Sequence, residues 1–422
     1  MNPWRNYFFG VNTPIYTPYG LTTRTFLNNA ATPQILKPVI QQFSELLDEY
    51  AYDNEPNVIS ARMRITYNEV RETVLDYIDG DPLFETVIFT QNTTTAINLV
   101  SHIFKQYDPD QVVLTTRMEH MANYLPYKEN LNTVLIGLTP EGNIDLDDYQ
   151  SKLDYYKGRV KLVAVTGASN ITGIIPPYHR MAALAHDYGA KIFLDAVQLV
   201  QHKLFSMKPR DDNEHIDFLS FDGHKCYTGQ SGGVLVGDKS FLDRFEPMIY
   251  GAGISDFVSD EHIVYREAPE RFEAGYPDFL GIISLGNALR FLKKADIIKI
   301  EKYESELYRY MLNSLRNIPK IILYGTVADN HIPVVSFNIN GIAYQELGKR
   351  LGYDYGIAVA SGTSGSNIYV QDLLELTNEQ AYKLFVSGQG FGVVRVSLGM
   401  YNSYEDIDRL ADALSAISGR IT

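Results

Sequence analysis

The amino-acid sequence predicts an α/β fold: a large domain with a mainly parallel, doubly wound sheet, followed by a smaller C-terminal α+β domain. Two observations support this expectation. Between residues 86 and 236, short apolar runs alternate with helical stretches, which is typical of parallel strands buried on both faces. Polar residues gather directly after these runs, where open α/β sheets bind their ligands. Beyond about residue 290 the alternation ends.

The strands of the large domain are the short apolar runs themselves. The helix after the first run is opened by threonines, which cap helices well. Two more helices fill the spaces between later runs. The expected strands are residues 86–90, 111–115, 160–166, 191–194, 218–221 and 233–236, and the expected helices are residues 94–105, 145–156 and 178–188.

The smaller domain is expected to begin with a long helix and to end with an amphipathic one. Its predicted elements are helices at 285–315, 344–351 and 404–418, and strands at 333–339, 357–359 and 392–398. The predicted boundaries are an irregular N-terminal arm at residues 1–25, a large domain at 26–290, and a small domain at 291–422 with the arm packed nearby.

Composition excludes several classes of protein. The 422 residues are 45% hydrophobic and 21% charged, as in ordinary globular proteins with two or more domains. A net charge of -14 argues against nucleic-acid binding, which needs a basic surface. No secretory signal pattern and no run of 18 apolar residues appears, so we expect no membrane partner. A single cysteine, Cys226, excludes an intrachain disulfide and fits a cytoplasmic location.

The chemistry is indicated by Lys225, Asp195 and Gln198. Asp195 ends an apolar run, and Lys225 follows another run thirty residues later. A lysine can form a Schiff base with pyridoxal 5'-phosphate (PLP), and an aspartate can keep the pyridine nitrogen protonated so that the ring accepts electrons. A lone lysine is more often a surface residue and a lone aspartate more often a turn residue. Their combination predicts a PLP site.

The start of the helix near residue 94 is a candidate phosphate site. Thr93, Thr94 and Thr95 open this helix, and a helix N-terminus offers free N–H groups and a favourable dipole to an anion. Simple capping by the threonines is compatible with the same role. We predict no metal site.

Most of the chain, residues 26–410, resembles the class V aminotransferase family of fold-type I PLP enzymes, in particular the cysteine desulfurase and selenocysteine lyase branch. Each matching motif is weak alone, but eight occur in the family's order. They are residues 27–32 (LNNAAT), 93–98 (TTTAIN), 119–120 with Asn123 and Pro126, 169–173 (SNITG), 195–198 (DAVQ), 223–225 (GHK), 271–275 (RFEAG) and 395–397 (RVS).

The resemblance implies roles for individual residues. Lys225, His120 and Asp195 are expected to be catalytic, with Lys225 moving the Cα proton and His120 stacked on the ring. Arg395 and Asn29 are expected to bind the substrate, since a guanidinium can grip a carboxylate. The expected cofactor-binding residues are Thr93, Thr94, His120, Asn170, Asp195, Gln198, His224, Lys225 and Tyr276.

The sequence departs from the family in the loop at residues 359–366. Family desulfurases carry an arginine and a sulfur-accepting cysteine there, but this chain has Ala360 and Gly365 at those positions. A persulfide relay through this loop is therefore not expected. Cys226 neighbours Lys225, so its side chain is expected to point the other way, as a small buried apolar group.

Two further departures concern the phosphate. Asp222 stands where the family has serine or threonine, and a carboxylate repels a phosphate. Asp222 must therefore turn away or be paired, for instance with His224 or with a basic residue of a second subunit. Tyr276 stands where the family has a threonine that reaches across the dimer interface.

The sequence thus predicts a homodimeric PLP enzyme for a small amino acid, with desulfurase-like cleavage of a C–S or C–Se bond favoured. Transamination and epimerisation remain open, because Lys225 and Asp195 serve all three reactions. A PLP-fold sensor or assembly partner without catalysis is a further alternative. An unrelated nucleotide-binding enzyme lacks support, because neither a G-x-G-x-x-G nor a P-loop motif is present in the expected place.

Overall fold

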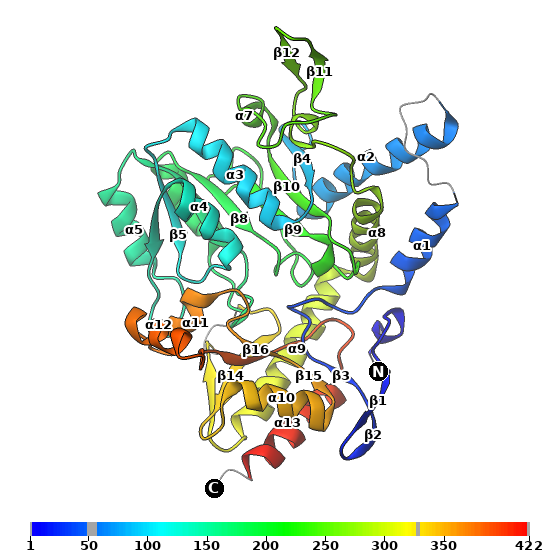
Figure 1. The fold of residues 1–422 in the computed structure, drawn as a ribbon, viewed down its shortest axis with the longest axis vertical. Helices are drawn as coiled ribbons and strands as arrows, with labels where there is room; N and C mark the ends of the chain where they lie inside the picture. Colours follow the sequence, from blue (N-terminus) through cyan, green and yellow to red (C-terminus); the bar gives the residue numbers. More distant parts are fainter. Residues whose placement is uncertain (1, 49–56, 326–329, 420–422) are drawn as a thin grey trace.

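A seven-stranded sheet forms the centre of the larger part of the computed structural model, which describes residues 2–48, 57–325 and 330–419 (Figure 1). Only β10 runs antiparallel to its neighbours; the other strands of the sheet share one direction. In spatial order the strands are β4 (Glu85–Thr90), β10 (Gly233–Asp238), β9 (Phe218–Asp222), β8 (Lys191–Asp195), β7 (Val160–Thr166), β5 (Val112–Thr116) and β6 (Asn132–Ile136).

Helices cover both faces of this sheet, which confirms the predicted fold class. Alternate residues of one strand enter different cores: Val113 packs with the residues of α3, whereas Leu114 packs with those of α2, α6 and α8. This is the alternation that a strand buried on both sides imposes. The helices around the sheet are α2 (Val58–Ile78), α3 (Thr93–Tyr107), α4 (Leu125–Asn130), α5 (Leu146–Tyr155), α6 (Tyr178–Asp187), α7 (Lys239–Leu242) and α8 (Phe279–Ala295).

The smaller part of the described structure contains a four-stranded antiparallel sheet with helices packed against it. The strands, in spatial order, are β13 (Ile321–Tyr324), β14 (Val334–Ile339), β17 (Val393–Ser397) and β16 (Ala360–Gly362). Its helices are α9 (Ile297–Arg316), α10 (Tyr344–Tyr355), α11 (Asn367–Leu373), α12 (Asn378–Val386) and α13 (Tyr404–Ser418). No helix in the described parts of the chain is long and apolar enough to cross a lipid bilayer.

Two sequence expectations differ from the structure. The helix predicted at residues 285–315 is two helices, because Asp296 has a φ of 71° and its carboxylate accepts a hydrogen bond from Ile298 N at the start of α9. Aspartate favours such a cap over a helix interior. The N-terminal arm is not irregular throughout: it contains a hairpin of β1 (Pro14–Thr17) and β2 (Gly20–Thr23).

Other elements were not predicted. They include α1 (Lys37–Leu47) and the hairpin of β11 (Ser255–Val258) and β12 (Ile263–Tyr265), which projects from the top of the molecule in Figure 1. Short 3-10 helices occur at η1 (Arg5–Tyr7), η2 (Met121–Asn123), η3 (Gly223–Lys225) and η4 (Glu270–Phe272). The domain boundaries themselves stay a prediction.

The segment after β3 (Thr25–Phe26) connects the two parts of the molecule. β3 pairs in parallel with β15 (Ile357–Ala358) of the smaller part. Next along the chain, Asn29 N donates to Ser397 O at 3.2 Å, and Ala30 N donates to Ser397 Oγ at 2.9 Å. The loop that follows is therefore fixed to the end of β17.

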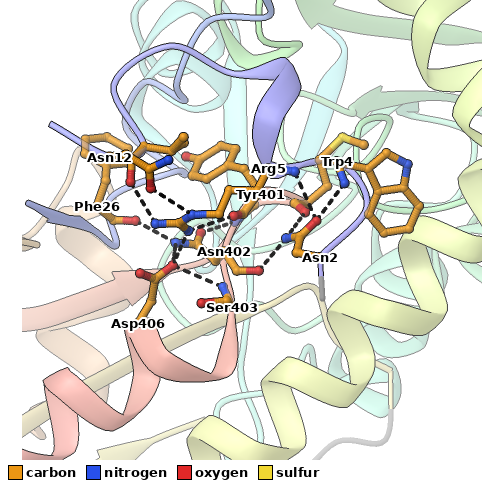
Figure 2. A network of polar contacts seen from close by, with 12 residues as sticks. Asn2, Trp4, Arg5, Asn12, Phe26, Tyr401, Asn402, Ser403 and Asp406 are labelled. Carbon is orange, nitrogen blue, oxygen red and sulfur yellow. Dashed lines mark hydrogen bonds and ion pairs between the residues drawn. The ribbon is translucent and has the colours of Figure 1, made fainter. Parts of the chain in front are cut away.

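The N-terminal arm is fixed by polar contacts with the loop that precedes α13 (Figure 2). Arg5 donates to Asp406 Oδ2 at 2.8 Å and to the carbonyl oxygens of Tyr401 and Val11. Asn2 Nδ2 donates to the Met400 and Asn402 carbonyl oxygens. Because Arg5 is only 21% exposed and Asp406 only 7%, these bonds are shielded from water more than a surface ion pair is.

We expect Arg5→Ala to lower the free energy of unfolding by about 1–3 kcal/mol, since it leaves the buried Asp406 without its ion-pair partner and frees two carbonyl oxygens. Denaturant unfolding measures the loss, and limited proteolysis should cut the arm faster. The control Arg309→Ala removes an exposed arginine of α9 and should change stability by less than about 0.5 kcal/mol. Equal stability of the two variants would contradict the anchoring role of Arg5.

Candidate active site

A cavity of about 590 Å³ lies where the parallel strands end. Loops that follow β4, β5, β7, β8 and β9 line it on one side, and residues of the smaller part close it on the other. The lining residues are Ala30, Ala31, Asn92, Thr93, Thr94, His120, Ala122, Thr166, Ala168, Asn170, Asp195, Val197, Gln198, Asp222, His224, Lys225, Ser231, Ala360, Ser364 and Arg395.

Lys225 reaches this cavity from η3, directly after β9. Its Nζ donates to the carbonyl oxygens of Ala30 and Ala31 in the connecting loop. Burial lowers the pKa of Lys225 to about 8, and the charge of Arg395 adds to this, while Asp222 and Asp195 oppose it. The amine is therefore far closer to its neutral, nucleophilic form at neutral pH than an ordinary lysine is.

Asp195 is the last residue of β8 and is 6% exposed. Its Oδ1 accepts a hydrogen bond from Val197 N at 3.2 Å. Burial raises the pKa of Asp195 to about 6, against this bond and the charge of Lys225. A further donor or cation from a ligand would stabilise the ionised carboxylate, as a protonated pyridine nitrogen does.

Gln198 and Asn170 line the cavity, but their amides are partly used by the protein. Gln198 Nε2 donates to Ala30 O at 2.8 Å, and its buried Oε1 has no partner among the described residues. Asn170 Nδ2 donates to Ser364 O at 2.9 Å, and Asn170 Oδ1 accepts from Ser366 Oγ at 2.7 Å. Each NH2 group retains a second hydrogen for a ligand oxygen.

His120 directly precedes η2 as its N-cap residue and lines the cavity. Its Nδ1 accepts from Ala122 N at 3.2 Å, so the proton of the neutral ring lies on Nε2. Desolvation by the surrounding protein, followed by the charges of Lys225 and Arg395, lowers the pKa of His120 to about 4. The ring is therefore neutral at physiological pH.

The loop at residues 360–366 lies against His120. Gly365 has a φ of 80°, and a Cβ atom built there would stand 2.2 Å from His120 Nε2. The Gly365 carbonyl also accepts from Met121 N at 2.7 Å. A side chain at this position would require the loop or the histidine to move and would be strained at this φ, which gives a physical reason for glycine here.

Glu119 is a buried acid next to the cavity that the sequence indicated only as part of a motif. It is 2% exposed and accepts from Thr116 Oγ1 at 2.6 Å, Asn123 Nδ2 at 2.7 Å and Thr166 N at 3.0 Å. Burial outweighs these bonds and raises the pKa of Glu119 to about 8. Its contacts join the ends of β5 and β7 and thereby orient the loop that carries His120.

Arg395 places a buried cation at the opposite wall. It is 2% exposed, and its Nη1 and Nη2 donate to Asn170 O at 2.9 Å and Asn28 Oδ1 at 3.1 Å. Its Nε has no hydrogen-bond partner, and no ion-pair partner is found for it within the described residues. Burial lowers the pKa of Arg395 to about 10. A carboxylate of a ligand would supply the missing anion.

The far end of the cavity carries the predicted phosphate residues. Thr93 begins α3, and its buried Oγ1 has no partner among the described residues. Thr94 and His224 also line the cavity. Asp222 is paired with His224, at 2.6 Å between Oδ1 and Nδ1, which is one of the arrangements that the sequence left open. Ser231 joins this group and was not predicted, because no motif marked it.

Two predicted site residues lie outside the cavity. Asn29 is 2% exposed, and its amide contacts Tyr401 OH at 2.9 Å and His202 Nε2 at 3.4 Å. The role of Asn29 in substrate binding stays a prediction; its neighbour Asn28 contacts Arg395. Tyr276 is 63% exposed and lines a second cavity, with Thr95 and Met248.

These residues fit PLP chemically. A buried carboxylate, a lysine of lowered pKa and the start of α3 line one cavity. Unpartnered polar atoms of Gln198, Thr93 and Arg395 remain there for a ligand. Asp195 would hold the ring nitrogen, Lys225 the aldehyde carbon, and Thr93, Thr94 and His224 the phosphate.

Comparisons with known proteins agree with this reading. The family model described as "Aminotransferase class-V" matches residues 25–410. A probable cysteine desulfurase of Pyrococcus abyssi is 33% identical, with 93% of this chain and 94% of that protein covered. A probable cysteine desulfurase of Staphylococcus aureus is 30% identical, with 92% of this chain and 91% of that protein covered. The solved apo structure of a cysteine desulfurase from Thermococcus onnurineus matches with a TM-score of 0.83 at 29% identity. The match covers 94% of this chain and 95% of that chain.

The lowered pKa of Lys225 predicts selective labelling. In apoprotein treated with an aldehyde and borohydride at pH 8, about half of the Lys225 amines are neutral, whereas lysines near the ordinary value of 10.5 are almost fully protonated. Peptide mass spectrometry should find Lys225 labelled first. The selectivity should shrink above about pH 10.5, where at least half of the ordinary lysine amines are neutral as well. Lys225→Arg is the control, and even labelling of surface lysines with Lys225 unmodified would refute the expectation.

Proposed function

The chain belongs to the class-V aminotransferase family and is a PLP-dependent enzyme; on this premise we propose that it cleaves the carbon–sulfur or carbon–selenium bond of a small amino acid. An amino acid is proposed as substrate because of Arg395. Its guanidinium is buried, has no ion-pair partner among the described residues and lines the same cavity as Lys225. The similarity to probable cysteine desulfurases supports sulfur or selenium at Cβ.

The roles of the side chains follow from their positions. When bound, PLP supplies an electron sink for the charge that develops at the substrate Cα. Arg395 binds the substrate carboxylate, and Lys225 removes the proton from Cα. Asp195 keeps the ring nitrogen protonated. His120, neutral and with its proton on Nε2, donates a hydrogen bond to the leaving sulfur or selenium.

We propose elimination rather than transfer of sulfur to the protein. The Cα–H bond breaks first and Lys225 takes the proton; the Cβ–S bond then breaks and sulfur leaves with the electron pair as hydrosulfide. Hydrolysis of the three-carbon remainder gives pyruvate and ammonia, so no oxidant or reductant is needed. Selenium would leave in the same way.

The absence of a usable thiol supports this choice. Gly365 stands at the position of the family's sulfur acceptor, and a Cβ atom there would meet His120. Cys226 is the only cysteine of the chain. It is fully buried, and burial strongly raises the pKa of its thiol, so the reactive thiolate is suppressed.

The products of cysteine or selenocysteine turnover test this function. We expect the holoenzyme to release pyruvate, ammonia and hydrosulfide or hydroselenide in equal amounts, as coupled lactate dehydrogenase and sulfide assays measure. Lys225→Ala should reduce turnover by at least about a thousandfold, because the base and cofactor anchor are lost. Alanine as the main product would contradict elimination. Conversion of the cofactor to its pyridoxamine form would indicate transamination, and racemised substrate would indicate epimerisation.

We further propose that the enzyme is a homodimer in the cytoplasm. Apolar side chains are exposed around the second cavity and on the projecting hairpin, where a second copy would bury them. These residues are Ile249, Tyr250, Tyr276, Phe257, Val258, Ile263 and Val264. The one buried cysteine fits a reducing compartment.

Phe257→Asp tests the dimer, because it places a charge on the β11–β12 hairpin. If a second copy covers this hairpin, burying the carboxylate should weaken association at least about tenfold, as sedimentation velocity over a concentration series measures. Phe385→Asp is the matched control: Phe385 is exposed on α12, away from the hairpin. A monomeric wild type, or equal weakening by both substitutions, would refute this interface.

A further inference from the structure

Asp222 occupies the anion-binding end of the cavity with a carboxylate of its own. It is 1% exposed and lies at the end of β9, among the residues that line the cavity. Its oxygens accept hydrogen bonds from Thr93 N at 3.2 Å, His224 N at 3.0 Å, His224 Nδ1 at 2.6 Å and Ser231 Oγ at 3.1 Å. An internal anion therefore uses donors of Thr93, His224 and Ser231.

The Asp222 carboxylate is ionised at neutral pH. Burial alone would raise its pKa, but the hydrogen bond and charge of His224, with the bonds from the His224 and Thr93 backbone, outweigh burial and lower it. Lys225 also faces it, and the Asp222 charge raises the pKa of that lysine. The pair of Asp222 and His224 is consequently a fixed feature of this end of the cavity.

Few donors remain for a phosphate at the start of α3. The N–H group of Thr93 is bound by Asp222, and that of Thr95 is bound by Asn92 Oδ1 at 2.9 Å. The helix start normally offers its first N–H groups to an anion. Thr93 Oγ1, buried and without a partner among the described residues, is left as a donor, together with Thr94.

We propose that Asp222 makes the phosphate a weak anchor for PLP in this chain, so that the cofactor is held mainly through its ring and exchanges with the surrounding solution. A phosphate ester carries between one and two negative charges at neutral pH. It must either approach Asp222 against like-charge repulsion or compete with the carboxylate for the same donors.

This inference rests on the proposed use of PLP, and it makes the activity of the enzyme depend on the concentration of free PLP. An enzyme that holds its cofactor weakly is partly in the apo form whenever free PLP is scarce. Its activity therefore follows the supply of PLP, and the fraction of active enzyme is set by mass action.

The test compares PLP with pyridoxal, which has the same ring and aldehyde but no phosphate. Apoprotein of the wild type and of Asp222→Asn is titrated with each compound, and the visible absorbance or the quenching of intrinsic fluorescence gives the dissociation constant. We expect Asp222→Asn to bind PLP at least about tenfold more tightly, or about 1.4 kcal/mol. Its affinity for pyridoxal should change by less than about threefold. The release of PLP should slow in parallel.

Two further variants complete the experiment. Asp222→Ser places the family's residue at this position and should also tighten PLP binding; it replaces Asp222→Asn if circular dichroism shows that variant to be unfolded. Asp211→Asn removes one exposed carboxylate from the surface and should leave both affinities unchanged.

The proposal is overturned if the Asp222 variants bind PLP as weakly as the wild type or more weakly, because Asp222 would then support the phosphate through His224. It is also overturned if the wild type already binds PLP more than about a thousandfold more tightly than pyridoxal. Failure of every folded variant, and of the wild type, to bind either compound would instead contradict the use of PLP itself.

Discussion

The active site depends on one short segment of backbone, the loop at residues 28–31. The Ala30 carbonyl accepts hydrogen bonds from both Gln198 and Lys225, while the Ala30 N–H donates to Ser397 at the end of β17. One peptide segment therefore fixes the lysine of the larger part against the smaller part, which carries Arg395. The distance between the amine and the guanidinium is set by this loop, and it decides how a ligand with a carboxylate is oriented between them.

The pKa values of three carboxylates close to the cavity depend on how far hydrogen bonds and nearby charges offset the effect of burial. Asp222 has many donors and its pKa is lowered, whereas burial outweighs the bonds of Asp195 and Glu119 and raises theirs. Asp195 in its ionised form would pair with a cationic ring nitrogen of the cofactor. Glu119 serves the loop that carries His120. The carboxylate group thus performs three tasks because the hydrogen-bond donors around it differ.

Much of this site could be predicted from the sequence, because Lys225, Asp195 and Asn170 follow strands that read as continuous apolar runs, and such strands end at one edge of a sheet. What could not be predicted depends on contacts between distant segments. Asn29 contacts Tyr401 and His202, which are far away from it in sequence. Ser231 and the pairing of Asp222 with His224 require the tertiary structure. The hairpin at β11 and β12 has exposed apolar side chains, so it lacked the alternating pattern by which strands are recognised.

The N-terminal arm has a consequence for the biosynthesis of the molecule. Asn2 and Arg5 are separated from their partners Met400, Tyr401 and Asp406 by 396 to 401 positions of the chain. The arm can therefore take its final place only after the segment up to Asp406 has been translated. Tyr401 also contacts Asn29 beside the loop that holds Lys225. The large sheet can assemble before that point in translation, whereas the contact of Tyr401 with Asn29 forms only after the segment around Tyr401 has left the ribosome.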